Sequence, residues 1–186
     1  MITYLQIKQI YPTAKNSNIN AVLPFLNSAI QRYGISNSLD RTRAFISQIL
    51  HESGGFKYME EIASGSAYEG RKDLGNINPG DGKLFKGRGP LQVTGRANYA
   101  KLTKRLNING INFEKTPDLL SNPKWGVEAA CLWWSDNHLN EMSDNLSGNI
   151  VADNGVFKMI TKTINGGYNG LDDRLRLYSL ALKYII

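Results

Sequence analysis

Apolar residues recur at steps of three and four along most of this chain, a spacing that predicts amphipathic α-helices. Over residues 19–33 the apolar positions share one helical face, and Gly34 follows as a stop signal. Pro24 lacks an N–H group, so we expect it near the first turn of that helix. A second helix is predicted over residues 40–52, beginning near Asp40.

The second half of the chain has the same helical spacing. Asn122 followed by Pro123 is typical of a helix start. A shorter helix is predicted over residues 155–164, ended by the Asn-Gly-Gly run at 165–167, and a last helix over residues 171–185. The helix after Pro123 carries an apolar stripe of Trp125, Ala129, Leu132 and Trp133. We expect the tryptophans, Trp134 included, to be core residues more than sugar platforms.

Residues 54–95 interrupt the helical pattern because glycine recurs through them. Such a segment favours loops and short hairpins, and a small hairpin is predicted within residues 84–94. Helices on both sides of an irregular segment suit a cleft with a loop wall. The prediction is therefore a mainly α fold and a single domain over residues 1–186, in which residues 54–95 form a loop and hairpin lobe.

The composition is that of a globular protein that carries an excess of positive charge. Of the 186 residues, 41% are hydrophobic and 20% charged, and the net charge is +6. That charge favours polyanions such as the acidic bacterial wall, or it only keeps the protein soluble. The basic residues are scattered, which argues against a nucleic-acid-binding arm. Cys131 is the single cysteine, so no internal disulfide forms, and we expect a core thiol.

Glu52 is the main candidate for chemistry. On the helix predicted over residues 40–52, Phe45, Ile49 and Glu52 share one face, so a carboxyl group continues an apolar stripe. Desolvation disfavours the charged form of a carboxyl group, and a general acid must carry a proton. The alternative is that Glu52 ends the stripe in solvent. The glycine pair at 54–55 ends the helix at once, a position that often borders a cleft.

A second carboxyl group would complete a glycosidase pair. Inverting glycosidases hold two carboxyl groups roughly 6.5–9.5 Å apart, with room for one water. On a continuous helix Glu52 and Glu61 would point apart, and the glycine pair removes that obstacle. Spacing alone leaves Glu60, Glu61 and Glu69 open as the second acid. Because Gly55 stands where a helical zinc protease needs its second histidine, we expect neither metal nor cofactor.

Three motifs carry a resemblance to glycoside hydrolase family 19. Residues 51–56, His-Glu-Ser-Gly-Gly-Phe, resemble the family's His-Glu-(Ser/Thr)-Gly-Gly signature. Residues 85–94 resemble its aromatic-x-Gly-Arg-Gly-Pro-hydrophobic-Gln segment, and residues 164–167 its Asn-Gly-Gly segment. The motifs follow the family order over about residues 40–180. The resemblance implies a two-lobed, lysozyme- or chitinase-like helical fold with a small β-hairpin region and a central cleft.

The resemblance also implies roles for individual residues. Glu52 matches the general acid, Glu61 the second carboxylate of the family's phage lysins and presumed base, and Thr94 the residue that helps hold the attacking water. The chitinases place their second Glu in a longer insert, so Glu69 stays an alternative base. Gln92, Asn98 and Asn165 match positions that contact sugar in the family. Arg174 matches a basic residue that supports the two acids. The other substrate-binding candidates are His51, Tyr58, Tyr68, Arg88 and Tyr99. Taken alone, Gly87-Arg88-Gly89 also suits a turn with an exposed Arg.

The chain looks more like the phage or prophage endolysins of that family than like its chitinases. The insert after Glu52 is short, and neither a disulfide nor a signal peptide is evident. The resemblance implies an inverting lysozyme-like enzyme that cuts β-1,4 bonds of peptidoglycan. Alternatives are a chitinase and a non-catalytic wall-binding protein. We expect a monomer without a wall-binding domain, nucleic-acid partner or stable membrane association, made in the host bacterial cytoplasm and released to the wall by holin-type export.

Overall fold

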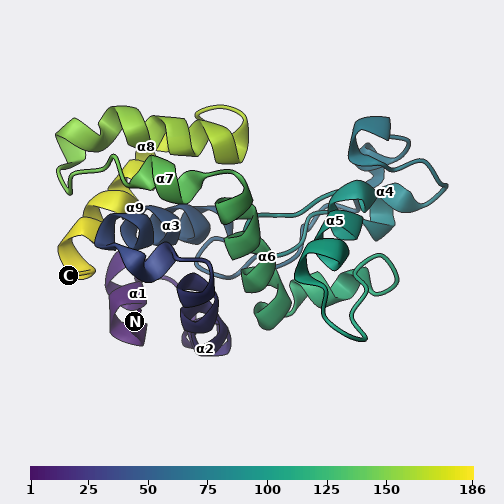
Figure 1. Cartoon of the computed structure of the whole chain (residues 1–186), viewed down its shortest axis with the longest axis horizontal. Helices are drawn as coiled ribbons and strands as arrows, with labels where there is room; N and C mark the ends of the chain where they lie inside the picture. Colours follow the sequence, from purple (N-terminus) through teal and green to yellow (C-terminus); the bar gives the residue numbers. More distant parts are fainter. The chain divides into compact units, whose positions relative to one another are not determined.

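The computed structural model describes residues 1–186, and helices make up most of it (Figure 1). The mainly α fold predicted from the sequence is confirmed. The α-helices are α1 (Tyr4–Ile10), α2 (Asn16–Arg32), α3 (Leu39–Glu52), α4 (Asp81–Leu84), α5 (Arg96–Leu106), α6 (Pro123–Asp136), α7 (Leu139–Ser143), α8 (Ile150–Asn165) and α9 (Leu171–Tyr184). Short 3₁₀ helices are η1 (Ile35–Asn37), η2 (Ser66–Tyr68), η3 (Lys72–Leu74) and η4 (Pro117–Ser121).

The chain divides into two compact units. The first contains residues 1–57 and 131–186, and the second contains residues 58–130. The second unit takes up nearly all of the glycine-rich segment and continues through α5 and η4. Each unit has its own buried residues, so each is described by itself.

The core of the first unit is built around α3. Phe45, Ile46, Ile49 and Leu50 are completely buried, as the apolar stripe predicts. Helix α9 lies side by side with α3, α8 and α1. Between α8 and α9 the rings of Phe157 and Tyr178 stack with their centroids 4.5 Å apart. This packing fixes the α9 side chains against the C-terminal end of α3.

The second unit has a small aromatic core and almost no β-structure. Phe85 and Tyr99 meet edge to face with centroids 5.2 Å apart, and both are completely buried. The hairpin predicted within residues 84–94 is reduced to isolated antiparallel bridges that pair Arg88 with Glu60 and with Val93. Leu84 ends α4 instead of starting a strand.

Two helix starts differ from the sequence prediction, and one helix was not predicted. Helix α2 begins at Asn16, so Pro24 lies inside it and not in its first turn; the buried Val22 and Leu26 hold that segment against the core. Helix α8 begins at Ile150, because the side chain of Asn149 accepts the N–H groups of Val151 and Ala152. Helix α1 was not predicted, and it is closed by a capping box between Thr3 and Gln6.

The predicted core thiol and one of the predicted core tryptophans are confirmed. Cys131 is buried and forms no disulfide. Trp134 is completely buried against Phe45, at 5.1 Å between ring centroids, whereas Trp125 and Trp133 are half-buried. No helix combines the length and the apolar character needed to cross a membrane.

Candidate active site

Glu52 is the last residue of α3, and the residues after it turn the chain away. The Ser53 hydroxyl donates to the carbonyl of Ile49 and accepts the N–H of Phe56, at 2.6 and 2.9 Å. The N–H of Gly55 donates to the carbonyl of Leu50 at 2.9 Å. These bonds satisfy the end of the helix and leave the Glu52 side chain 22% exposed at the border of the core.

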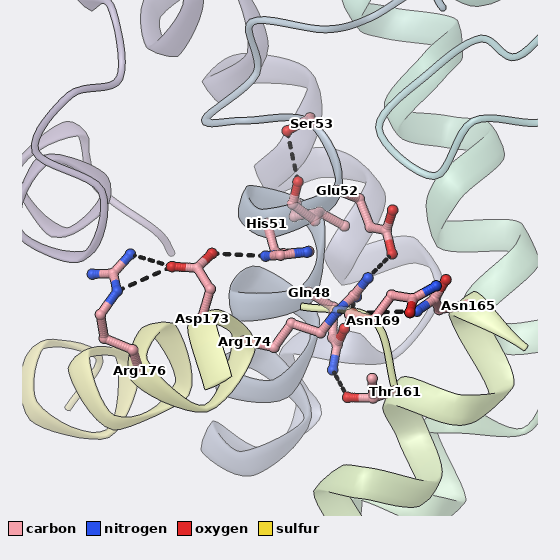
Figure 2. A network of polar contacts seen from close by, with 11 residues as sticks. Gln48, His51, Glu52, Ser53, Thr161, Asn165, Asn169, Asp173, Arg174 and Arg176 are labelled. Carbon is pink, nitrogen blue, oxygen red and sulfur yellow. Dashed lines mark hydrogen bonds and ion pairs between the residues drawn. The ribbon is translucent and has the colours of Figure 1, made fainter. Parts of the chain in front are cut away.

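The Glu52 carboxylate is held by a buried arginine from α9 (Figure 2). The Arg174 side chain is only 2% exposed, and its Nη2 donates to Glu52. Its Nη1 donates to the side-chain oxygen of Gln48, and its Nε to the carbonyl of Asn169 at 3.2 Å. Gln48 in turn donates to the hydroxyl of Thr161 at 2.9 Å. The Arg174 guanidinium therefore links Glu52 and Gln48 of α3 to the turn before α9, and Gln48 extends the network to α8.

This arginine changes the electrostatic picture drawn from the sequence. The apolar stripe of α3 predicts apolar surroundings for Glu52, whereas the structure places the cationic Arg174 side chain in contact with its carboxylate. The stripe considers one helix alone, and Arg174 lies 122 positions further along the chain. The position of Glu52 thus follows from α3, but its ion-pair partner comes from α9.

His51 forms a second polar pair beside Glu52. Its Nδ1 lies 2.7 Å from one carboxylate oxygen of Asp173, and the other oxygen of that carboxylate accepts from Arg176 (Figure 2). Burial alone would raise the pKa of Asp173, but the hydrogen bonds from His51 and Arg176 outweigh it and lower that pKa below its usual value. The other edge of the His51 ring lies against Gly170, so the ring is clamped between Asp173 and the backbone.

Two glycines of the same loop give a matched test of that clamp. Gly166 and Gly170 have φ values of +72° and +69°. A Cβ at Gly166 would meet no atom within 4 Å, whereas one at Gly170 would lie 2.4 Å from the His51 ring. Both alanine variants carry a backbone cost of about 1–2 kcal/mol. We expect Gly170→Ala to lower the free energy of unfolding by a further ~1–3 kcal/mol because the ring must move.

Urea unfolding of the two variants and of the unaltered protein measures this difference. The His51 side-chain resonances should shift in Gly170→Ala and stay unchanged in Gly166→Ala. Equal destabilisation by the two substitutions would contradict the clamp.

Glu61 lies in the second unit, within a group of neutral hydrogen-bond donors. Its carboxylate accepts from the Tyr68 hydroxyl and from the N–H of Gly87, both at 3.1 Å. Burial, and then the hydrogen bond to Glu61, raises the pKa of Tyr68 above its usual value. The Glu61 backbone N–H donates to the carbonyl of Gly87, and Lys86 Nζ donates to the Glu61 carbonyl. Direct hydrogen bonds to the side chain and to the backbone of Glu61 therefore fix the position of its carboxylate.

Three more predicted residues gather on the same side of the second unit. A Cβ added to Gly87 would lie 2.7 Å from the side-chain oxygen of Gln92 and 3.3 Å from a carboxylate oxygen of Glu61, so both groups face this glycine. The Thr94 hydroxyl donates to the Gln92 carbonyl at 2.9 Å, and the Asn98 amide donates to the Thr94 carbonyl at 2.7 Å. The structure thus brings together Glu61, Tyr68 and Gln92, and local hydrogen bonds link Thr94 and Asn98 to Gln92.

Glu60 and Glu69, the alternatives to Glu61, take part in other contacts. Glu60 forms ion pairs with Lys86 and Arg88 at 3.0 and 3.2 Å. The carboxylate of Glu69 accepts the N–H groups of Gly80 and Gly82, at 2.6 and 2.8 Å. Both carboxylates thereby stabilise the folded loop. Glu61 as the second acid stays a prediction.

Tyr99 and Arg88 do not fit the predicted role of sugar contacts. Tyr99 is completely buried: its hydroxyl donates to the carbonyl of Lys86 at 2.7 Å and accepts from Arg88 at 3.0 Å. Arg88 is 3% exposed and pairs with Asp118 at 2.6 Å, so it is not the exposed turn residue that was the other interpretation. Sequence spacing places both beside the motif, but their side chains face the core.

The buried phenol of Tyr99 leads to a prediction on alkaline stability. Burial outweighs the opposing effect of Arg88 and raises the pKa of Tyr99 from 10.0 to about 12. Since the folded-state pKa lies above the unfolded value, this stabilisation is complete below pH 10 and is lost as the pH rises towards 12. Two pKa units correspond to about 2–3 kcal/mol. Urea unfolding of the unaltered protein and Tyr99→Phe should therefore show a stability difference that falls by about this amount between pH 9 and pH 12. A stability difference between the two proteins that does not change with pH would contradict the raised pKa of Tyr99.

The remaining polar residues around Glu52 and Arg174 include one that was predicted from the sequence and three that were not. Asn165, predicted from its motif, donates to the Asn169 carbonyl at 3.2 Å, and it shares that acceptor with Arg174. Gln48, Thr161 and Asp173 were not predicted. For Gln48 a signal exists, because it lies one turn before Glu52 on α3. No group of three His, Cys, Asp or Glu side chains is arranged to hold a metal ion.

Comparison with known proteins identifies several that are similar to this chain in sequence. No protein-family model matches the chain. The chain is 29% identical to a glycosyl hydrolase family 19 domain-containing protein of Haemophilus influenzae, over 96% of this chain and 94% of that protein. Chitinase 4 of Oryza sativa is 28% identical over 84% of this chain, and an endochitinase of Arabidopsis thaliana 34% identical over 67%. The chain spans only 58% and 38% of these two plant proteins.

Solved structures show the same architecture. Chitinase C of Streptomyces griseus matches with a TM-score of 0.69 and 19% identity, over 99% of this chain and 76% of that one. A bacterial family 19 chitinase matches with a TM-score of 0.65 and 22% identity, over 97% of this chain and 94% of that one. At such identities the likeness concerns the fold.

Proposed function

The relatives and the solved structures support a glycosidase of the chitinase-like glycoside hydrolase family 19, and from that premise we propose that this chain hydrolyses the β-1,4 bonds between the amino sugars of peptidoglycan. The observation that carries the proposal is a carboxylate at the end of α3, fixed by a buried arginine. The net charge of +6 supports an anionic wall polymer as the substrate.

We assign the general acid to Glu52. In the reaction it gives its proton to the glycosidic oxygen, so negative charge develops on its carboxylate in the transition state. Arg174 is already in contact with that carboxylate and stabilises the developing charge. Gln48 and Asn169 hold the guanidinium in place, so little reorganisation is needed during the reaction.

We assign the general base to Glu61. It takes a proton from a water, which attacks C1 while the bond to the leaving oxygen breaks, and the anomeric configuration inverts. The Tyr68 hydroxyl and the Gly87 N–H donate to the ionised form and fix its orientation. Thr94, whose backbone and side chain bond Asn98 and Gln92, is proposed to position the water.

The assignment is tested by the products of purified peptidoglycan. Mass analysis should show fragments with an intact reducing end, and NMR during the first minutes should show the inverted anomer. A retained anomer would contradict the roles of Glu52 and Glu61. Fragments ending in an anhydro sugar would exclude hydrolysis.

Chitin is the second candidate substrate, because the plant relatives are named chitinase and endochitinase. The same assay on N-acetylglucosamine oligomers separates the two. We expect a higher kcat/KM on peptidoglycan; a higher value on the oligomers would assign the chain to chitin.

We further propose an endolysin role for residues 1–186, acting as one monomeric catalytic domain. The enzyme would be made in the cytoplasm of a host bacterium and would reach the wall after holin-type release. Expression with and without a pore-forming holin tests this, since lysis should require both proteins. Lysis without the holin would contradict the export route.

A further inference from the structure

The first unit contains a pocket that the assigned catalytic residues do not use. Its volume is about 480 Å³, and it is lined by Met142, Met159, Lys162, Thr163, Gly166 and Tyr168. A volume of this size is within the range of small-molecule sites, roughly 300–1,000 Å³. Met142 comes from α7, which lies beside α8, whereas the other residues come from α8 and the turn after it (Figure 1).

The lining combines apolar groups with one free cation. Met159, Lys162, Thr163 and Gly166 follow at i, i+3, i+4 and i+7, so they form one stripe of α8. Met159 is 57% and Tyr168 53% exposed, so large apolar surfaces face solvent at the pocket. Lys162 forms no ion pair, and from residue 158 to residue 170 the chain carries two lysines and no acidic residue. An occupant that complements this pocket has methyl groups and a carboxylate.

The pocket adjoins the network that holds Glu52. Gly166 lines the pocket and directly follows Asn165, whose amide donates to the Asn169 carbonyl. That carbonyl also accepts from Arg174 Nε (Figure 2). A group bound at Gly166 and Tyr168 therefore contacts the same turn that positions the arginine of the acid. The location suits a branch of the substrate that carries the scissile bond.

We propose that this pocket binds the lactyl-peptide arm of a muramyl sugar, and the inference rests on the proposed action on peptidoglycan. The arm offers methyl groups to Met142 and Met159 and a carboxylate to Lys162, and it packs against the face of Tyr168. Chitin has no such arm. The pocket thereby determines the preference for peptidoglycan over chitin.

A binding experiment tests the pocket independently of hydrolysis. The chain has four methionines, and two of them line the pocket, so a spectrum of ¹³C-labelled methionine methyl groups reports on it directly. The probe is N-acetylmuramyl-L-alanyl-D-glutamate, with di-N-acetylglucosamine as the neutral control. We expect the Met142 and Met159 signals to move with the muramyl probe and to stay in place with the control. Equal shifts with both ligands, or shifts confined to Met1 and Met59, would overturn the proposal.

Substitution of Lys162 provides the second part of the test. Lys162→Met should raise the Kd of the muramyl probe about tenfold, because a charge-assisted hydrogen bond is lost. Lys158→Met, one turn earlier on α8 and outside the pocket, makes the same charge change and should alter the Kd less than twofold. If both substitutions raised the Kd equally, Lys162 would act only through long-range electrostatic attraction. That result would contradict a direct contact between Lys162 and the probe.

Kinetics distinguish failure of the inference from failure of the proposed function. Lys162→Met should raise KM on peptidoglycan and leave KM on chitin oligomers unchanged. An unaltered protein that cuts only chitin would refute the proposed substrate, whereas the methionine shifts would still decide whether the pocket binds the arm.

Discussion

Glu52→Gln is expected to lower kcat on the amino-sugar polymer by about 10²–10⁴-fold, the usual contribution of a general acid. The amide keeps the shape of the side chain, and its oxygen can still accept from Arg174, but it has no acidic proton to give to the leaving oxygen. Glu52 is at the end of α3 and partly exposed, and the amide oxygen still accepts from Arg174, so the helix should persist although the loss of the counter-charge to the buried Arg174 costs stability. Release of reducing ends measures the loss, and circular dichroism measures the fold.

Glu141→Gln is the matched control for this change. Glu141 lies on α7 in the same unit, its side chain is 67% exposed, and a ring nitrogen of His138 lies 4.0 Å from its carboxylate. The control should keep activity within twofold. A Glu52→Gln variant that remains as active as Glu141→Gln would remove Glu52 from the reaction. Binding of the polymer without turnover by the unaltered protein would favour a wall-binding protein instead.

The sequence predicted the parts of the site that depend on one segment. The apolar stripe of α3 and the glycine pair after it place Glu52 at a helix end, and the structure has that arrangement. The end of α8 at the Asn-Gly-Gly run was predicted for the same reason. In each of these cases the periodicity and the stop signal are neighbours in the sequence, so local physics decides the outcome.

The sequence failed where packing between distant segments decides. Tyr99 has the appearance of a loop-flanking aromatic residue, yet Phe85 and Arg88 bury it. Arg174 was predicted only through a family resemblance, and its bonds to Gln48 and Asn169 have no pattern in the sequence. Local patterns show which face of a helix is apolar, but not which helix will cover it.

Arg174→Met should destabilise the protein strongly, because it leaves the Glu52 carboxylate without its cation. Removing one partner of a buried ion pair costs about 3–5 kcal/mol, and the 22% exposure of Glu52 favours the lower end of that range. Methionine keeps much of the apolar volume, so the loss reports mainly on polar contacts. Urea unfolding gives the change in the free energy of unfolding.

The exposed neighbour Arg176 provides the control, and a double mutant isolates the charge. Arg176 is 51% exposed and pairs with Asp173 on the surface of α9, so Arg176→Met should cost less than about 1 kcal/mol. Adding Glu52→Gln to Arg174→Met removes the uncompensated carboxylate, and the double mutant should recover about 1–3 kcal/mol relative to additivity. If the two substitutions are additive, Arg174 stabilises the fold through Gln48 and Asn169 alone. Its contact with Glu52 then contributes nothing to stability, and the proposed support of the acid would have to rest on kinetics.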